Sequence, residues 1–289
     1  MDPLTADYET NNCHLVKYSD IIQLDDTHLK IPFRTYELYL VDIFDIHQVK
    51  YEIVDDYIIS SDITRADIYN FINENYYFDQ YWDYVQDLSM PSKLFRMTPL
   101  LARYFTTETD DIPIPDELIH IFRLAISTYD KTFLRLNSVS PHLDEYISDP
   151  VEIINRWKKN PRITNTIRTM LEYDTEIFLV ARQWMEIEPE MEFRCFVYKG
   201  TLTAISQYYL LDIAEPEKIK NLICQWWKSN REAIPYEDCV MDLCIVDEKV
   251  LVIEFGPFGI DLNAGSCTYN WLSDYHILYN WKAEIPDIR

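Results

Sequence analysis

The segment from Pro189 to Tyr209, which reads PEMEFRCFVYKGTLTAISQYY, constrains the fold of this chain more than any other. Charged and apolar residues alternate in its first half at the two-residue period of a β-strand, and Lys199-Gly200 marks a turn into a second strand. A two-residue turn would place Glu192 opposite Gln207. The sequence therefore predicts a hairpin that gathers Glu192, Arg194 and Gln207 on one face, where they would line a cleft.

Glycine is scarce, with only four in 289 residues, at positions 200, 256, 259 and 265. A Walker loop and a GxGxxG dinucleotide motif both need closely spaced glycines, so neither is present. If this chain binds a nucleotide, side chains on strands must hold its phosphates.

Helical and strand periods along the chain predict an α+β class. Residues 1–30 are polar and acidic, which is typical of an extended arm, and residues 31–289 are expected to form a single unit with lobes at about 31–130 and 131–289. Helices are predicted within 63–101, with breaks at Pro91 and Pro99, and over 116–128, 149–157 and 215–229. Strands are predicted over 133–136, 177–184, 192–197, 201–207, 241–246 and 250–255.

Two carboxylates stand on the last two predicted strands, whose other residues are mostly apolar. Asp242 lies on the first strand and Glu254 on the second, with residues 247–249 between the strands. A three-residue loop would pair Val246 with Val250 and put the carboxylates roughly 5 Å apart, whereas a two-residue loop would place them on opposite faces. Two such carboxylates must share a proton or a cation, and Mg²⁺ with nucleotide phosphates suits them. The alternative is a carboxylate in water at the strand end.

The formal charge of −23 argues against a protein that binds nucleic-acid backbones. It favours a basic protein surface as partner, with plain solubility as the alternative. The chain has no run of eighteen apolar residues and no N-terminal signal pattern, so we expect neither membrane insertion nor secretion, and a cytoplasmic location. Six cysteines without a CxxC pair predict reduced thiols.

Several segments together resemble the cell division cycle protein 123 family. The strongest are EFRCFV and AISQ in the hairpin, preceded by Arg182-Gln183-Trp184. LRLNSVSP at 134–141 and IEFGPFG at 253–259 are similar to the family's Lys-Leu-Asn-Trp-Ser-Ala-Pro and Asp-Phe-Asn-Pro-Phe-Gly motifs, and weaker likeness at 32–40 and near Trp271 extends over most of the chain. That family has an ATP-grasp type of fold and acts in assembling eukaryotic translation initiation factor 2.

The resemblance implies an ATP-grasp-like fold, with antiparallel sheets flanked by helices in two lobes and a nucleotide cleft between them. It implies ATP and Mg²⁺ as cofactors, and the gamma subunit of translation initiation factor 2 as the partner of a monomeric protein. The residues that match ATP-contacting positions are Arg135, Asn137, Ser140, Lys158, Arg182, Gln183, Trp184, Met185 and Arg194. Those that match metal ligands are Asp242, Glu254 and Gly256.

This chain departs from the family pattern at several of these positions. Arg135 replaces Lys, which keeps the charge but changes a compact ammonium into a planar fork. Gly256 replaces an Asn ligand, so we expect weaker metal affinity or the loss of one of two ions. Ser138 replaces Trp, and Tyr208-Tyr209 replace Arg-Asp. Such changes indicate a divergent member, as in a viral copy.

Two of the matched residues have simpler interpretations. Lys158 stands with two other basic residues near a predicted helix C-terminus, where such clusters are commonly solvated. Trp184 fits an ordinary core position as well as an adenine contact. Both alternatives remain open from the sequence.

Three functions fit these observations. The leading one is an ATP- and Mg²⁺-binding assembly factor, a chaperone without demonstrable turnover. An ATP-grasp ligase that forms an acyl phosphate is the second, and the lost Asn ligand and lost basic residue argue against it because that chemistry requires strong charge neutralisation. The third is a nucleotide-free decoy that keeps only the partner surface.

Overall fold

The computed structural model describes residues 76–289 except 108, 110, 111, 142–145, 260–264 and 272, together with the backbone of four strands nearer the N-terminus. These strands are β1 (Ile22–Asp25), β2 (His28–Pro32), β3 (Tyr51–Val54) and β4 (Tyr57–Ser60), in one antiparallel sheet of order β1-β2-β4-β3. Part of the predicted arm therefore lies in strands. The rest of the arm, residues 63–75 of the predicted helical region and most of the 32–40 motif lie outside the described residues.

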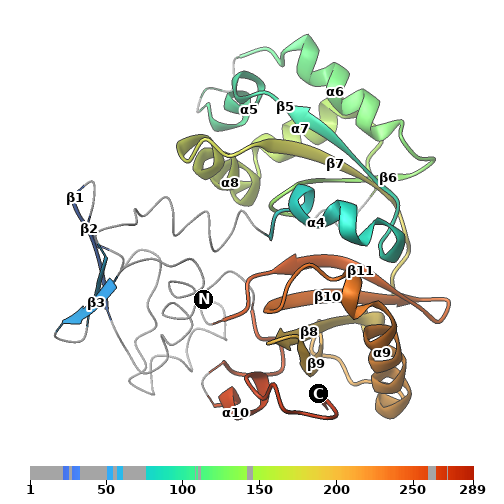
Figure 1. Ribbon diagram of the computed structural model, residues 1–289. Helices are drawn as coiled ribbons and strands as arrows, with labels where there is room; N and C mark the ends of the chain where they lie inside the picture. The colour runs from blue at the N-terminus through green and yellow to red at the C-terminus, as the bar shows by residue number, and fades with distance from the viewer. Residues whose placement is uncertain are drawn as a thin grey trace.

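The first lobe contains an antiparallel sheet with helices packed on one face (Figure 1). Its strands are β5 (Ser92–Met97), β6 (Thr132–Leu136) and β7 (Ile177–Gln183), in the order β5-β7-β6. The helices are α5 (Pro99–Thr106), α6 (Asp116–Ile126), α7 (Pro150–Lys158) and α8 (Pro161–Glu172). The lobe boundary expected between residues 130 and 131 falls inside this lobe, because β6 and β7 pair with each other and β7 with β5.

Helix starts in this lobe follow the capping signals in the sequence. Asp149 caps α7 by accepting a hydrogen bond from the amide of Val151 at 2.8 Å, as predicted. Asn160 caps α8 in the same way, with Pro161 in the first turn, although this helix was not predicted. Residues 92–97 form a strand where helix was predicted, because pairing with β7 decides their conformation.

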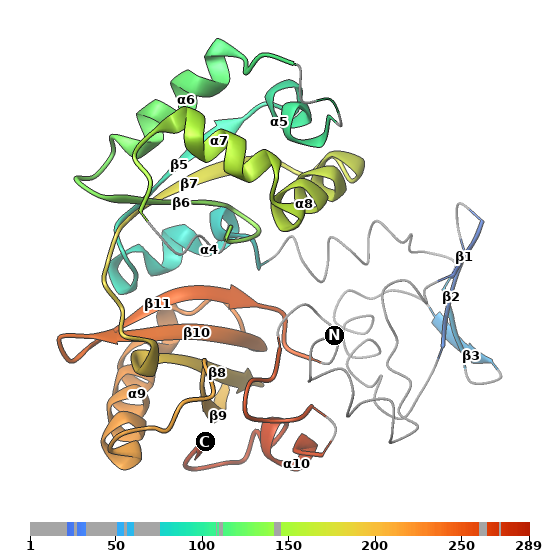
Figure 2. The same cartoon turned by 180° about the vertical axis from the view of Figure 1, so that it is seen from behind.

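The second lobe is built on a five-stranded sheet of order β11-β10-β8-β9-β12 (Figure 2). The strands are β8 (Glu192–Tyr198), β9 (Thr201–Gln207), β10 (Cys239–Val246), β11 (Lys249–Gly256) and β12 (Asp287–Ile288). One face packs against α9 (Pro216–Asn230) and against α4 (Phe78–Val85), which lies between the two sheets. On the other face Phe196 and Val240 pack under Phe258 and Trp271, near α10 (Tyr275–Leu278).

The β8–β9 hairpin has the predicted two-residue turn but not the predicted register. Tyr198 pairs with Thr201, and a bulge next to Val197 then shifts the strands by one residue. Gln207 therefore faces Phe193 rather than Glu192, and its side chain bonds the backbone of Pro189 and Leu211. The prediction that Gln207 shares a face with Arg194 was wrong, because a bulge is not visible in a period-two pattern.

The β10–β11 hairpin pairs its carboxylates as predicted, but by a different route. The turn contains two residues, Asp247 and Glu248, both with positive φ (49° and 62°), so the three-residue loop was wrong. A bulge restores the pairing, because Leu243 faces Val252 while Asp242 faces Glu254. The carboxylates consequently lie side by side on one face of the sheet.

The predicted α+β class is confirmed by this arrangement. Cys195, Cys224, Cys239, Cys244 and Cys267 are free thiols, as predicted for reduced cysteines. Within the described ranges, no helix has the length and apolar character needed to cross a bilayer.

Candidate functional site

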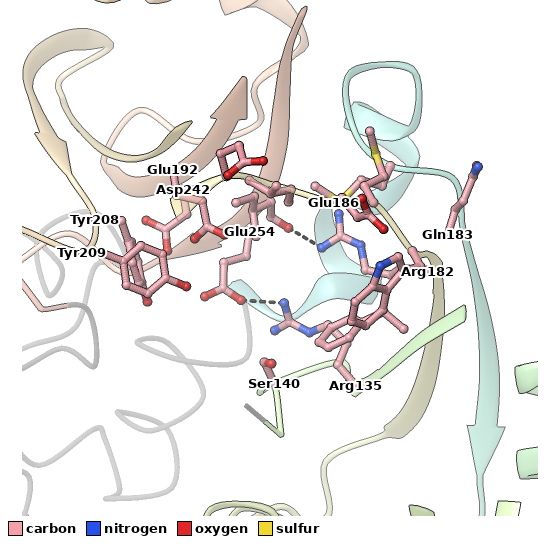
Figure 3. A pocket seen from close by; sticks show the side chains of 17 residues that line it. Arg135, Ser140, Arg182, Gln183, Glu186, Glu192, Tyr208, Tyr209, Asp242 and Glu254 are labelled. Atoms are coloured by element: carbon pink, nitrogen blue, oxygen red, sulfur yellow. Dashed lines mark hydrogen bonds and ion pairs between the residues drawn. The ribbon is translucent and has the colours of Figure 1, made fainter. Parts of the chain in front are cut away.

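A cleft of about 660 Å³ lies between the two lobes, and residues from both sheets line it (Figure 3). Its walls combine apolar and aromatic side chains with arginines and carboxylates. The lining residues are Met90, Phe133, Arg135, Ser140, Arg182, Gln183, Trp184, Met185, Glu186, Ile187, Glu188, Glu192, Tyr208, Tyr209, Asp242, Ile253 and Glu254.

A row of polar residues crosses the second sheet at the floor of the cleft. Arg194 on β8 pairs with Ser206 on β9 and with Asp242 on β10, and Asp242 pairs with Glu254 on β11. Directly opposed residues in antiparallel strands place their side chains on the same face. The register of three strands thus brings one guanidinium and two carboxylates into line.

Arg194 and Asp242 form a bidentate ion pair within this row. The Nε and Nη2 atoms of Arg194 donate to the two carboxylate oxygens at 2.8 and 2.7 Å, and Nη1 donates to the Gly265 carbonyl at 2.7 Å. Both side chains are at most 10% exposed. Burial opposes the charge on Arg194, but the Asp242 carboxylate outweighs it and raises the Arg194 pKa. The pair is a buried charged unit with all of the arginine's donor groups engaged.

Arg135 and Glu254 form a second ion pair, which joins the two lobes. Nη1 of Arg135 on β6 donates to Glu254 Oε2 at 2.6 Å, and Nε donates to the Leu136 carbonyl at 3.0 Å. The Arg135 side chain is 4% exposed, whereas that of Glu254 is 31% exposed. Burial disfavours the Glu254 charge, but Arg135 outweighs it and lowers the pKa of Glu254. Glu254 is therefore ionised and partly open to the cleft.

Arg182 lies on β7, above the edge of the second sheet. Nη1 donates to the Ile253 carbonyl at 2.7 Å, and Nη2 donates to Ser89 Oγ at 2.9 Å and to the Val252 carbonyl at 3.3 Å. Its Nε is buried and has no hydrogen-bond partner among the residues that the structure describes. Burial, together with nearby Arg135, lowers the Arg182 pKa to about 10. This is a buried cation with one donor group still unsatisfied.

Glu192 and two tyrosines form the acidic end of the cleft. Burial raises the pKa of Glu192 to about 7, and the charges of Asp242 and Glu254 add to the effect. The Tyr208 ring lies under the Arg194 guanidinium, at 4.9 Å from ring centroid to Cζ. Burial raises the pKa of the Tyr208 hydroxyl to about 12, so this hydroxyl remains protonated near neutral pH.

The hinge between the lobes forms the apolar end. Trp184 follows β7, and its ring packs against Phe133 and Tyr146, with centroid distances of 6.4 and 5.9 Å. Trp184 is half-buried and lines the cleft with Met185, so the core interpretation does not describe it fully. Gln183 is exposed, and its side chain extends away from the carboxylates (Figure 3).

Four of the residues matched to the family motif do not line the cleft, namely Asn137, Lys158, Arg194 and Gly256. Arg194 lies behind Asp242, to which it is bonded. Asn137 is buried and uses its amide to bond Asp79 and the backbone of Glu176 and Phe178. These bonds join α4, β6 and β7. Lys158 is at the surface, where its ammonium donates to the Thr109 carbonyl at 2.9 Å and lies 4.5 Å from the Tyr104 ring centroid. This placement agrees with the surface-cluster interpretation.

Gly256 ends β11 and pairs with Val240, and it offers only backbone atoms. Within the described part of the chain, no group of three or more His, Cys, Asp or Glu residues is arranged to hold a metal ion.

Sequence reasoning missed some of the residues that line the cleft or support it. It treated Tyr208 and Tyr209 only as lost charges, whereas both line the cleft, and it did not identify Phe133. The two tyrosines directly follow the strand that carries the AISQ motif, which was an available signal. Ser89, which supports Arg182, lies far away in sequence and gave no signal.

Comparisons with known proteins agree with this fold. A CDC123-like protein of Acanthamoeba polyphaga mimivirus is 26% identical over 91% of this chain and 94% of its own length. A translation initiation factor eIF2 assembly protein of Xenopus tropicalis is 36% identical over 88 residues, which are 28% of this chain and 26% of that protein. Cdc123 from Schizosaccharomyces pombe has a similar structure, with a TM-score of 0.65, 18% identity and coverage of 75% of this chain and 95% of that one.

The structural likeness to Cdc123 shows that this chain shares the fold of that protein, within the predicted α+β class. The family model described as D123 matches residues 125–284, which is more than half of the 289 residues. This chain therefore belongs to the D123 family, as a divergent member.

Proposed function

We propose that this chain is an ATP- and Mg²⁺-binding assembly factor for translation initiation factor 2, and that it contacts the gamma subunit of that factor. Membership of the D123 family and the similarity to proteins named as eIF2 assembly proteins support the partner. The observation that carries the nucleotide part is the convergence of Arg135 and Arg182 with Asp242 and Glu254 in one interlobe cleft, where Arg194 supports Asp242 from behind the wall.

The cleft suits a polyphosphate. Arg182 lines the cleft and adds positive charge to its wall, while its Nη atoms bond the β11 backbone. Arg135 reaches the same space from β6, so phosphate oxygens would exchange one charge-assisted bond for another. Because no glycine-rich loop is present, these guanidiniums would hold the phosphates.

The carboxylates suit a cation only in company with those phosphates. Asp242 and Glu254 offer oxygen ligands side by side, but each already faces an arginine, and Gly256 adds no side chain. Mg²⁺ commonly takes one or two protein carboxylates and completes its shell with phosphate oxygens and water. When bound, the cation would neutralise part of the phosphate charge.

The apolar end of the cleft suits an adenine ring. Trp184, Met185 and Phe133 supply flat or flexible apolar surface there. Ligand pockets typically combine such surface with a few polar groups that fix orientation. Adenine at the hinge would leave the phosphates directed toward Arg135 and Arg182.

The charge of the chain suits a basic partner surface. With a formal net charge of −23, this protein would attract a basic face on the gamma subunit and would repel nucleic acid. We propose that it acts as a monomer in the cytoplasm.

Isothermal titration of the purified chain with the gamma subunit, with and without ATP and Mg²⁺, tests this function. We expect saturable binding that tightens when nucleotide is present. A matched control is Arg168→Gln, which alters an exposed arginine bonded to Asn165 and is expected to change nothing. Binding that ignores nucleotide would indicate the decoy, and an absence of binding to the gamma subunit would refute the assembly role.

A further inference from the structure

The β-bulge in β11 determines whether the two carboxylates meet. On the turn side of the bulge, Leu243 pairs with Val252 and Val246 with Lys249. Continued without interruption, that register would place Ile253 opposite Asp242 and turn Glu254 to the other face. Ile253 is instead the extra residue, so Glu254 comes to face Asp242.

A side chain from the other lobe binds the backbone at this bulge. The Ile253 carbonyl accepts a hydrogen bond of 2.7 Å from Arg182 Nη1, which is drawn as a dashed line in Figure 3. The preceding carbonyl, of Val252, accepts bonds from Arg182 Nη2 at 3.3 Å and from Ser89 Oγ at 2.6 Å. Ser89 also accepts a bond from Arg182, so the three groups form one network.

This network does not resemble ordinary charge pairing. Arg182 is 2% exposed, and its hydrogen-bond partners among the described residues are two carbonyls and a hydroxyl, with no carboxylate. Burial of a cation without an opposite charge is costly unless its hydrogen bonds compensate. A guanidinium, with donors in a rigid planar fork, can bridge two successive carbonyls.

We propose that Arg182 is a positioning residue, which clamps the bulge at Ile253 and thereby holds Glu254 opposite Asp242. The proposal deepens the proposed function, because these carboxylates are the candidate cation ligands. Arg182 belongs to the first lobe and the bulge to the second. Separation of the lobes would therefore release the bulge and take the carboxylate pair apart.

Two engineered disulfide cross-links report the register between β10 and β11 in the absence of ligand. The pair Val240→Cys with Gly256→Cys lies beyond the bulge, where these positions face each other only if the bulge is present. The second reporter, Leu251→Cys with the native Cys244, lies on the turn side and does not depend on the bulge. Mass spectrometry of the oxidised protein gives the ratio of the two cross-links.

Arg182→Gln is expected to lower the ratio of the first cross-link to the second by about tenfold or more, the factor for one charge-assisted hydrogen bond. Ser89→Ala, which does not line the cleft, is expected to lower it by about threefold, as for a neutral bond. Arg231→Gln is the matched control, because Arg231 also bonds backbone carbonyls, at Gly200 and Ile234, far from the bulge. It is expected to leave the ratio unchanged.

An unchanged ratio in Arg182→Gln would overturn the proposal, as would an equal fall in the Arg231→Gln control. Loss of both cross-links in Arg182→Gln would show that this variant is unfolded. The Ser89→Ala variant then decides, because a lowered ratio supports the clamp and an unchanged ratio overturns it. Because no nucleotide or metal is added, the result is independent of nucleotide binding. A chain that fails to bind ATP would refute the proposed function and leave this test intact.

Discussion

The two arginine–carboxylate pairs in the cleft differ in where their partners come from. Arg194 and Asp242 lie on adjacent strands of one sheet, share two hydrogen bonds and are almost completely buried. Arg135 and Glu254 come from different lobes, share one bond and leave Glu254 31% exposed. The first pair is part of the sheet's architecture, whereas the second joins the two lobes and leaves its carboxylate partly open to the cleft. The same chemistry thus holds strands together in one place and lobes in the other.

Loss of Asp242 should have the largest effect on stability. Asp242→Ala leaves the Arg194 guanidinium buried without the carboxylate that receives two of its hydrogen bonds, while the bond to the Gly265 carbonyl remains. Breaking a buried pair in this way typically costs about 3–5 kcal/mol in the free energy of unfolding. Urea denaturation followed by circular dichroism measures it, with exposed Glu190→Gln as the control. A loss below about 1 kcal/mol would show that the pair is not architectural.

Loss of the Glu254 charge should have a smaller effect on stability and a larger one on ligand binding. Glu254→Gln keeps the shape and one acceptor, so we expect a cost of about 1–3 kcal/mol. The Mg²⁺-dependent part of nucleotide binding should disappear, because the cleft then has a single carboxylate at this point. Parallel urea and calorimetric measurements separate the two effects. If Glu254→Gln were as unstable as Asp242→Ala and kept its Mg²⁺-dependent nucleotide binding, the roles of the two pairs would be reversed.

The sequence predicted that Asp242 and Glu254 meet, but not the bulge that brings them together, and it wrongly placed Gln207 on the face of Arg194. Period-two alternation and the apolar flanks around Asp242 and Glu254 indicated paired strands, and the resemblance indicated the arginines. The turn at Asp247-Glu248 was misjudged because two non-glycine residues adopt positive φ there, which sequence rules disfavour.

The missed parts depend on long-range contacts. β5 carries no strong strand pattern and is a strand because it pairs with β7. Asn137 matched a nucleotide-binding motif, yet its amide joins α4 to the first sheet. A motif specifies residue types, and only the packing shows which of them face the cleft.

The pH dependence of stability tests the acidic end of the cleft, where Glu192 lies beside the two arginine–carboxylate pairs. The folded-state pKa of Glu192 is about 7, above its ordinary value of 4.5, because of burial and the charges of Asp242 and Glu254. Between these values the unfolded chain releases a proton that the folded chain retains, so this group's contribution to stability falls as pH rises and is lost above about pH 7.

Glu192→Gln should therefore be more stable than the native chain at pH 8 and equal to it near pH 4.5. Since the side chain is half-buried, solvent screening limits the gain at pH 8 to about 1 kcal/mol. Urea denaturation at the two pH values measures the difference. A gain of the same size at both would mean that the carboxylate does not titrate in this range.

Restoring the missing side chain at position 256 should have the smallest effect on stability. The φ angle of Gly256 is not positive, so Gly256→Asn meets no left-handed strain and should change the free energy of unfolding by less than about 0.5 kcal/mol. The new amide oxygen should strengthen the Mg²⁺ dependence of nucleotide binding by about tenfold, the scale of changes around a metal. Unaltered Mg²⁺ dependence would place the cation elsewhere.

Calorimetric titration of the native chain with ATP and Mg²⁺ tests most directly whether the interlobe cleft is a nucleotide-binding site. We expect saturable heat, and at about one hundred times the dissociation constant a rise of about 2.7 kcal/mol in the free energy of unfolding. No heat and no stabilisation at millimolar nucleotide would contradict the account, and would leave a D123-family protein whose cleft has a different ligand or none.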